Sequence, residues 1–132
     1  MRKSLSCLLL LFSLLLLTSC ARDTTYDNFA TCIADSGATF YGAFWCPHCS
    51  DQKKLFGDSK DLLPYVECDP NGNNSQAQLC KDEGIESYPI WKFSDGTTKG
   101  GLVSLDDLSS QTNCPLPGEE SIMVQDITEA KK

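Results

Sequence analysis

The sequence predicts an α/β fold in which a small mixed sheet is flanked by helices. Residues 38–45 carry no charge and are rich in aromatic, small and β-branched residues, which is typical of a central strand buried on both faces. Segments with helical spacing of apolar residues alternate with short strand-like segments. The pair Asp95-Gly96 is a hairpin signal, so the two strands around it are expected to run antiparallel.

The elements are expected in the order helix, strand, helix, strand, helix, strand, strand, helix. Ser75 and Ser104 are expected to cap the helices that follow them, and residues 58–61 to form a polar linker. The expected positions are 28–35, 38–45, 47–56, 65–68, 75–84, 89–93, 97–103 and 104 onward.

The first nineteen residues are typical of a secretion signal. Arg2 and Lys3 precede an apolar run over 5–17, which is shorter than the roughly 20 residues that a membrane-spanning helix needs. The run ends in Leu17-Thr18-Ser19-Cys20, which resembles the bacterial lipobox, in which the cysteine is lipidated. The chain is therefore expected to be exported as a membrane-anchored lipoprotein that faces the periplasm or another extracytoplasmic space. The alternative is an ordinary signal peptide, with Cys20 an incidental thiol.

The charge and length of the chain limit its partners and its domain organisation. The 132 residues have a formal net charge of −7, and loss of the signal removes basic residues only, so binding to nucleic acid is not expected. What remains suffices for one small domain, expected as a monomer. The expected divisions are a signal at 1–19, a polar tether at 20–27, a folded domain at 28–114 and a mobile tail at 115–132.

A Cys-x-x-Cys motif follows the predicted central strand directly. In Cys46-Pro47-His48-Cys49, Pro47 suits the first turn of a helix, so the first sulfur is expected at the helix N-terminus, where a thiolate is favoured. Cys46 is thus the predicted nucleophile, and Cys49 is the predicted resolving thiol. His48 is expected to stabilise the Cys46 thiolate, which makes the disulfide form a stronger oxidant.

Other uses of the motif fit the sequence less well. Haem attachment needs a histidine at position 50, which is Ser50. A zinc site would have to recruit Cys68 and Cys80, which do not form a second close pair. A purely structural disulfide across so short a loop would constrain little. The expected redox centre is therefore the Cys46–Cys49 pair itself, without a metal or another cofactor.

A second feature, Tyr88-Pro89, opens a later strand, and with it the chain resembles the thioredoxin superfamily. The strings at 41–49, 52–57, 65–68 and 87–91 are more closely similar to the thioredoxin-like domain found fused to, or paired with, homologues of vitamin K epoxide reductase. This resemblance implies a thioredoxin-like fold. It also implies that Pro89 is a cis-proline facing the redox cysteine, and that with Tyr88 it holds the substrate chain. The alternative is a trans-proline that starts an edge strand.

The same resemblance implies a function. Domains of this kind oxidise thiols of exported proteins and pass electrons to the membrane reductase homologue, here expected as a separate partner. The strand before the motif has Phe40 where thioredoxin keeps a buried acid, which also favours an oxidant. The alternatives are a reductant of exported thiols and a non-catalytic binding lipoprotein. Of the nearby side chains, Trp45 is expected partly to contact substrate and Trp91 to pack inside, while Lys53 and Lys54 are expected on a solvated face.

Six cysteines follow Cys20, an even number that suits an oxidising compartment. With the redox pair set aside, the other four leave three connectivities. The family resemblance favours Cys68 with Cys80, which leaves Cys32 with Cys114 as a second structural bridge. The alternative is that Cys32 or Cys114 relays electrons to the membrane partner.

Overall fold

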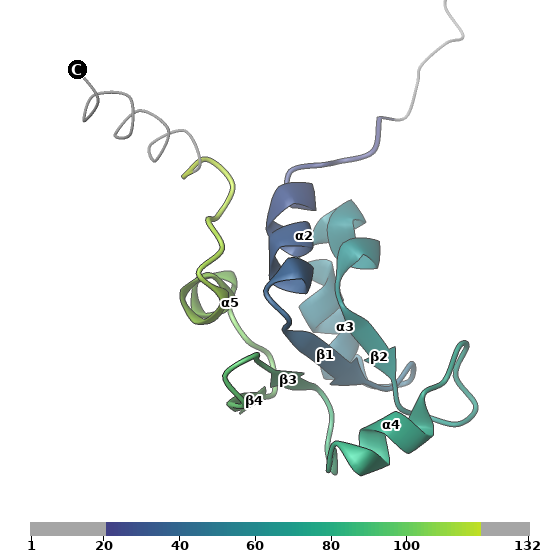
Figure 1. Cartoon of the computed structure of the whole chain (residues 1–132). Helices are drawn as coiled ribbons and strands as arrows, with labels where there is room; N and C mark the ends of the chain where they lie inside the picture. Colours follow the sequence, from purple (N-terminus) through teal and green to yellow (C-terminus); the bar gives the residue numbers. More distant parts are fainter. Residues whose placement is uncertain (1–20, 120–132) are drawn as a thin grey trace, which may run out of the picture.

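The computed structural model describes residues 21–119 (Figure 1). The predicted signal peptide, the predicted lipidation site at Cys20 and the tail from residue 120 lie outside the described residues. None of the helices within 21–119 has the length and apolar character needed to cross a membrane. The elements are α2 (Asp27–Asp35), β1 (Thr39–Gly42), α3 (Pro47–Lys54), the 3-10 helix η1 (Gly57–Leu62), β2 (Tyr65–Glu67), α4 (Ala77–Asp82), β3 (Ile90–Lys92), β4 (Thr98–Gly100) and α5 (Leu105–Thr112).

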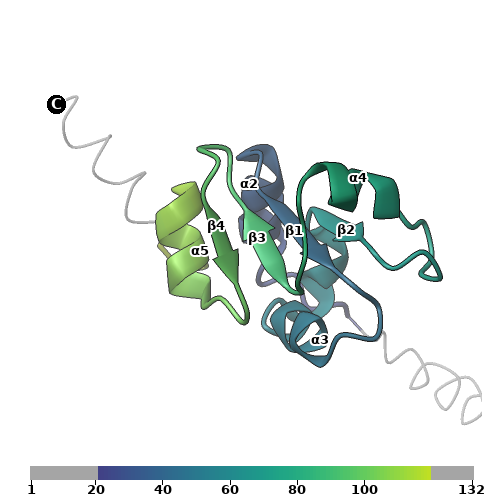
Figure 2. The ribbon, with the colours of Figure 1, turned by 90° about the horizontal axis from the view of Figure 1, so that it is seen from below.

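The four strands form one mixed sheet in the order β2-β1-β3-β4, which Figure 2 shows side by side. β1 runs parallel to β2 and antiparallel to β3, and β3 and β4 form the hairpin predicted from Asp95-Gly96. With helices packed on the sheet, this is a thioredoxin-like α/β fold, as the sequence predicted. β1 therefore lies inside the sheet, and its C-terminal end carries the cysteine motif.

Alternating side chains of β1 divide the core between the two faces of the sheet. Phe40 points to the larger cluster, which also contains buried residues of α2, α3 and α5. Its ring stacks on Trp91 at 4.8 Å between centroids, and Trp91 is fully buried, so the expectation that it packs inside is confirmed. Tyr41 points to the smaller cluster with Val66 and the cysteine of α4, Cys80. Period-two alternation thus places α4 opposite the other helices.

Two disulfides hold helices to this framework. Cys32 of α2 is bonded to Cys114 after α5, with 5.8 Å between the Cα atoms. Cys68 after β2 is bonded to Cys80 of α4, with 5.7 Å between the Cα atoms. The first bridge joins the two ends of the folded domain. The described part of the tail stays close to the domain, because Leu116 packs against the larger core cluster.

Three local expectations are wrong. The central strand ends at Gly42 and not at residue 45, because the chain turns there and the Cys46 amide donates to the Ala43 carbonyl at 3.0 Å. Ser75 does not cap α4, which follows Gln76 without a side-chain cap, and the buried Ser75 hydroxyl has no hydrogen-bond partner among residues 21–119. The polar linker at 58–61 lies within η1.

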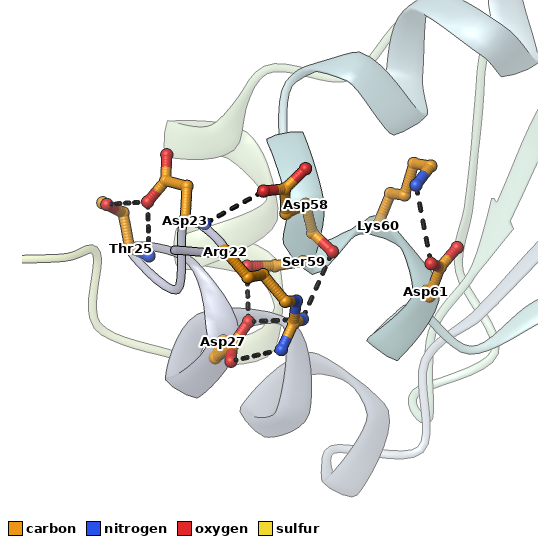
Figure 3. A network of polar contacts seen from close by, with 8 residues as sticks. All are labelled: Arg22, Asp23, Thr25, Asp27, Asp58, Ser59, Lys60 and Asp61. Atoms are coloured by element: carbon orange, nitrogen blue, oxygen red, sulfur yellow. Dashed lines mark hydrogen bonds and ion pairs between the residues drawn. The ribbon is translucent and has the colours of Figure 1, made fainter. Parts of the chain in front are cut away.

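The predicted tether is held against the domain from Arg22 onward (Figure 3). The Arg22 guanidinium donates to both carboxylate oxygens of Asp27 and to the Asp58 carbonyl, while the Asp23 amide donates to the Asp58 carboxylate at 2.9 Å. The buried Ser59 hydroxyl donates to Asp27 at 2.6 Å. Complementary charge therefore fastens this segment to α2 and η1.

We expect the two disulfides to differ in their contribution to stability. The Cys32–Cys114 bridge closes a loop of 82 residues and the Cys68–Cys80 bridge one of 12. In the chain-entropy treatment, replacing both cysteines of a bridge by alanine lowers the free energy of unfolding by about 4.5 kcal/mol for the first and about 3 kcal/mol for the second. Denaturant unfolding of the two double variants measures this order. A larger loss from the shorter loop would contradict the prediction.

Candidate active site

The cysteine motif lies at the N-terminal end of α3. Cys46 is the residue before the helix, and its sulfur accepts a hydrogen bond from the Cys49 amide at 3.3 Å. Pro47 takes the first helical position, where a missing N–H has no cost. An amide N–H and the helix dipole both stabilise negative charge on the Cys46 sulfur. The local sequence therefore places Cys46, the predicted nucleophile, where negative charge on its sulfur is stabilised.

Cys46 and Cys49 are free thiols, whereas the other four cysteines within 21–119 are bonded in disulfides. Both thiols are buried, but their surroundings differ. The Cys49 residue is 2% exposed, and its sulfur lies so close to β1 that a methyl group on Gly42 would come within 2.9 Å of it. Burial, followed by a hydrogen bond with Cys46, raises the pKa of Cys49 to about 12. Cys49 is therefore a neutral thiol at neutral pH.

The substrate-binding residues predicted from the sequence lie beside this motif. The Tyr88–Pro89 peptide bond is cis, and Pro89 is fully buried before β3. The Trp45 ring meets the Tyr88 ring edge-on at 6.2 Å between centroids. The turn before Cys46 is thus in direct contact with the residue before Pro89.

Two exposed aromatic side chains flank the motif. Phe44 and Trp45 are 62% and 59% exposed, which is unusual for such large apolar groups. Trp45 is nevertheless held in place, because its indole N–H donates to the Asp69 carboxylate at 2.7 Å. That hydrogen bond is the main cause of the lowered pKa of Asp69. The two rings therefore present apolar surface to solvent next to the motif.

His48 is exposed on the first turn of α3 and forms no hydrogen bond with a described residue. Its predicted role, donation to the Cys46 thiolate, stays a prediction. Among the described residues, no group of three or more histidine, cysteine, aspartate or glutamate side chains is arranged to hold a metal ion.

Gln52 fixes the position of α3, a role that the sequence analysis missed. Its side chain is fully buried, donates to the Val103 carbonyl at 3.0 Å and accepts from the Val103 amide at 2.8 Å. This pair of bonds ties the active-site helix to the segment before α5. A polar residue at a core position of the helix was the available signal.

The prediction of a solvated Lys53 is wrong. Its ammonium nitrogen lies 3.3 Å from the centroid of the Tyr65 ring, a cation–π contact, and burial lowers the pKa of Lys53. Lys54 does lie on the exposed face, where it pairs with Asp51 at 2.8 Å. Helical spacing alone does not distinguish two adjacent lysines.

A buried acid, Glu67, lies on β2 although the strand before the motif has none. Glu67 is 6% exposed and accepts hydrogen bonds from the Tyr65 hydroxyl at 2.8 Å and from the Asp69 amide at 2.9 Å. Phe40, at the position that lacks the acid, pairs with Tyr65 across the parallel strands. The sequence signal was a glutamate in the middle of a short apolar strand.

An open pocket of about 250 Å³ beside α3 reaches Cys49. Three lysines give it positive charge and Phe44 gives it an apolar edge. Its lining residues are Ala43, Phe44, Cys49, Ser50, Lys53, Lys54 and Lys60.

The fold and the site define a thioredoxin-like domain with a dithiol at the start of its active-site helix. No family model matches the chain. Over 84 residues, or 61% of the chain, it is 39% identical to the thiol-disulfide oxidoreductase LTO1 of Arabidopsis thaliana. The match covers 22% of that protein, so this chain corresponds to about a fifth of its relative.

We expect iodoacetamide to modify Cys46 at neutral pH and to leave Cys49 unmodified in the dithiol form. The pKa of Cys49 is raised from its ordinary value of 9.0 to about 12, so the unreactive neutral thiol persists until the pH approaches 12. Mass spectrometry of the two cysteine peptides measures this difference. In the Cys46→Ser variant, rapid labelling of Cys49 at pH 7 would contradict the assignment.

Proposed function

We propose that this chain is an exported thiol-disulfide oxidoreductase that forms or isomerises disulfides in exported proteins. The observation that carries the proposal is the dithiol at the N-terminus of α3, in which the Cys46 sulfur accepts a hydrogen bond from an amide and the pKa of the buried Cys49 thiol is raised. The similarity to a named thiol-disulfide oxidoreductase supports the same chemistry. The exposed Phe44 and Trp45 rings support a protein substrate.

The proposed oxidation proceeds in two exchanges. A substrate thiolate attacks the Cys46 sulfur of the Cys46–Cys49 disulfide, so that a substrate–Cys46 bond forms and Cys49 leaves with an electron pair and takes up a proton. A second substrate thiolate then attacks the substrate sulfur, which forms the substrate disulfide and releases Cys46 as a thiolate. The substrate loses two electrons and the enzyme dithiol holds them.

The dithiol must then be reoxidised, which requires a two-electron acceptor. We propose a membrane homologue of vitamin K epoxide reductase as this partner, with the domain held at the membrane surface by a lipid on Cys20. Two features support this arrangement: the lipobox-like Leu17-Thr18-Ser19-Cys20 string, and the flanking strings of the motif that resemble domains fused to or paired with that reductase.

The reduction potential of the Cys46–Cys49 couple tests the direction of the reaction. We expect a value clearly less negative than the roughly −270 mV of thioredoxin, because stabilisation of the Cys46 thiolate stabilises the dithiol. A value near that of thioredoxin would overturn the oxidant assignment and favour a reductant. The Cys49→Ala variant should accumulate mixed disulfides on Cys46, and the Cys46→Ala/Cys49→Ala variant should accumulate none. Absence of any trapped protein would favour the binding lipoprotein.

Lipid labelling tests the anchor. We expect the full chain expressed in a bacterium to incorporate radiolabelled fatty acid and to sediment with membranes, and the Cys20→Ala variant to do neither. The Cys7→Ala variant is the matched control, because Cys7 belongs to the predicted signal. Export of an unlabelled wild-type chain would show an ordinary signal peptide.

A further inference from the structure

The proposed function leaves one chemical requirement unassigned, namely the path of the proton on Cys49. In each cycle this thiol must either lose its proton to attack a mixed disulfide or regain one as it leaves the Cys46–Cys49 bond. The Cys49 residue is 2% exposed and the pKa of its thiol is raised to about 12, so at neutral pH water is too weak a base to take this proton readily. A neighbouring group that accepts and returns the proton would remove this obstacle.

Gly42 leaves a space in which such a group can approach Cys49. A methyl group at this position would lie 2.9 Å from the Cys49 sulfur, 2.8 Å from Tyr65 Cε2 and 3.3 Å from the Tyr65 hydroxyl. Because glycine has no side chain, the thiol and the phenol hydroxyl face the same gap on β1. Tyr65 comes from the neighbouring strand β2, so the sheet itself places the two groups together.

The Tyr65 hydroxyl in turn donates to Glu67 Oε2 at 2.8 Å. The other carboxylate oxygen, Oε1, accepts from the Asp69 amide at 2.9 Å. Gly72 closes over this carboxyl so tightly that a methyl group there would come within 2.5 Å of Glu67 Cδ. Glu67 is thus an enclosed proton acceptor, and the Tyr65 hydroxyl connects it to the gap at Gly42 that the Cys49 thiol faces.

Lys53 completes the cluster from the helix side. Its ammonium lies over the Tyr65 ring at 3.3 Å, and it interacts electrostatically with both Cys49 and Glu67. A cation in this place favours negative charge on either group. The other titratable groups that act on the cluster are Cys46 before α3, Lys60 and Asp61 of η1, Asp69 and Tyr88.

We propose that Tyr65 and Glu67 form a proton relay for Cys49. When Cys49 resolves a mixed disulfide, its proton passes to the Tyr65 oxygen while the Tyr65 proton passes to the Glu67 carboxylate. The Cys49 electron pair forms the bond to the Cys46 sulfur, and the substrate sulfur leaves with the pair of the broken bond. When Cys49 is the leaving group, the same protons move in the opposite direction. The relay rests on the proposed exchange chemistry. It assigns the groups that speed proton transfer to and from the buried Cys49 thiol.

The relay is tested on the full chain in its dithiol form with Ellman's reagent. Cys46 reacts first and forms a mixed disulfide, and attack by Cys49 then releases a second chromophore in a phase whose rate is independent of reagent concentration. The Cys49→Ala variant identifies this phase because it lacks it. Reactions of other thiols depend on reagent concentration and are separated in this way.

We expect Glu67→Gln and Tyr65→Phe to slow the intramolecular phase at pH 7 by on the order of 10²-fold, the lower end of what a positioned acid or base contributes. The pH profile should also change. The wild-type rate should be level around neutral pH, whereas the variant rates should rise about tenfold per pH unit, because hydroxide then takes the proton. Tyr65→Phe retains the ring under Lys53, so a merely structural role would leave the pH profile unchanged.

Tyr26→Phe is the matched control, because Tyr26 packs edge-on against Phe56 and is not part of the proposed relay. Its rate and pH profile should equal those of the wild type. Wild-type-like profiles in both relay variants would overturn the relay while leaving the oxidoreductase assignment intact. Absence of the intramolecular phase from the wild type would instead contradict the proposed function itself.

Discussion

The contact between the Cys49 sulfur and the bare backbone of Gly42 is the constraint on which the site depends. It sets how closely α3 approaches β1, because any side chain at this position would collide with both the sulfur and Tyr65. Both cysteines are buried, but the close approach encloses the Cys49 sulfur against the sheet, while the Cys46 sulfur lies at the helix N-terminus and accepts a hydrogen bond from an amide. The difference between the two cysteines is thus a result of packing density at a single position on the central strand.

The remaining architecture keeps that contact in register. The stacked Phe40 and Trp91 rings hold β1 against β3, and the parallel pairing with β2 brings Tyr65 beside the motif. Gln52 secures α3 at its far side through both backbone groups of Val103. Each of these interactions is buried, so each resists the local opening that would expose the resolving thiol.

Much of the fold followed from the sequence because its signals are local. The uncharged run ahead of the motif, the Asp-Gly turn and Pro47 each act within a few residues, and they gave the correct order of strands and helices. The redox motif was also recognisable from the sequence. The relay cluster was not, because Lys53, Tyr65 and Glu67 meet only after two strands and a helix have packed. Ser75 shows the reverse error, since a residue that commonly caps helices stands too far ahead of α4 to do so.

The clasp that Arg22 makes with Asp27 and Asp58 has a consequence for the position of the redox pair. With Cys20 as the anchor, only Ala21 separates the lipid from the clasped residue. Asp58 lies beyond the C-terminal end of α3 and Cys46 at its N-terminal end, about 12 Å of helix apart. With the proposed lipid on Cys20, these contacts would hold the redox pair about one helix length from the anchored end. Because the Arg22 side chain is exposed, salt screens its pairing with Asp27, so the stand-off between the proposed anchor and the dithiol would depend on ionic strength.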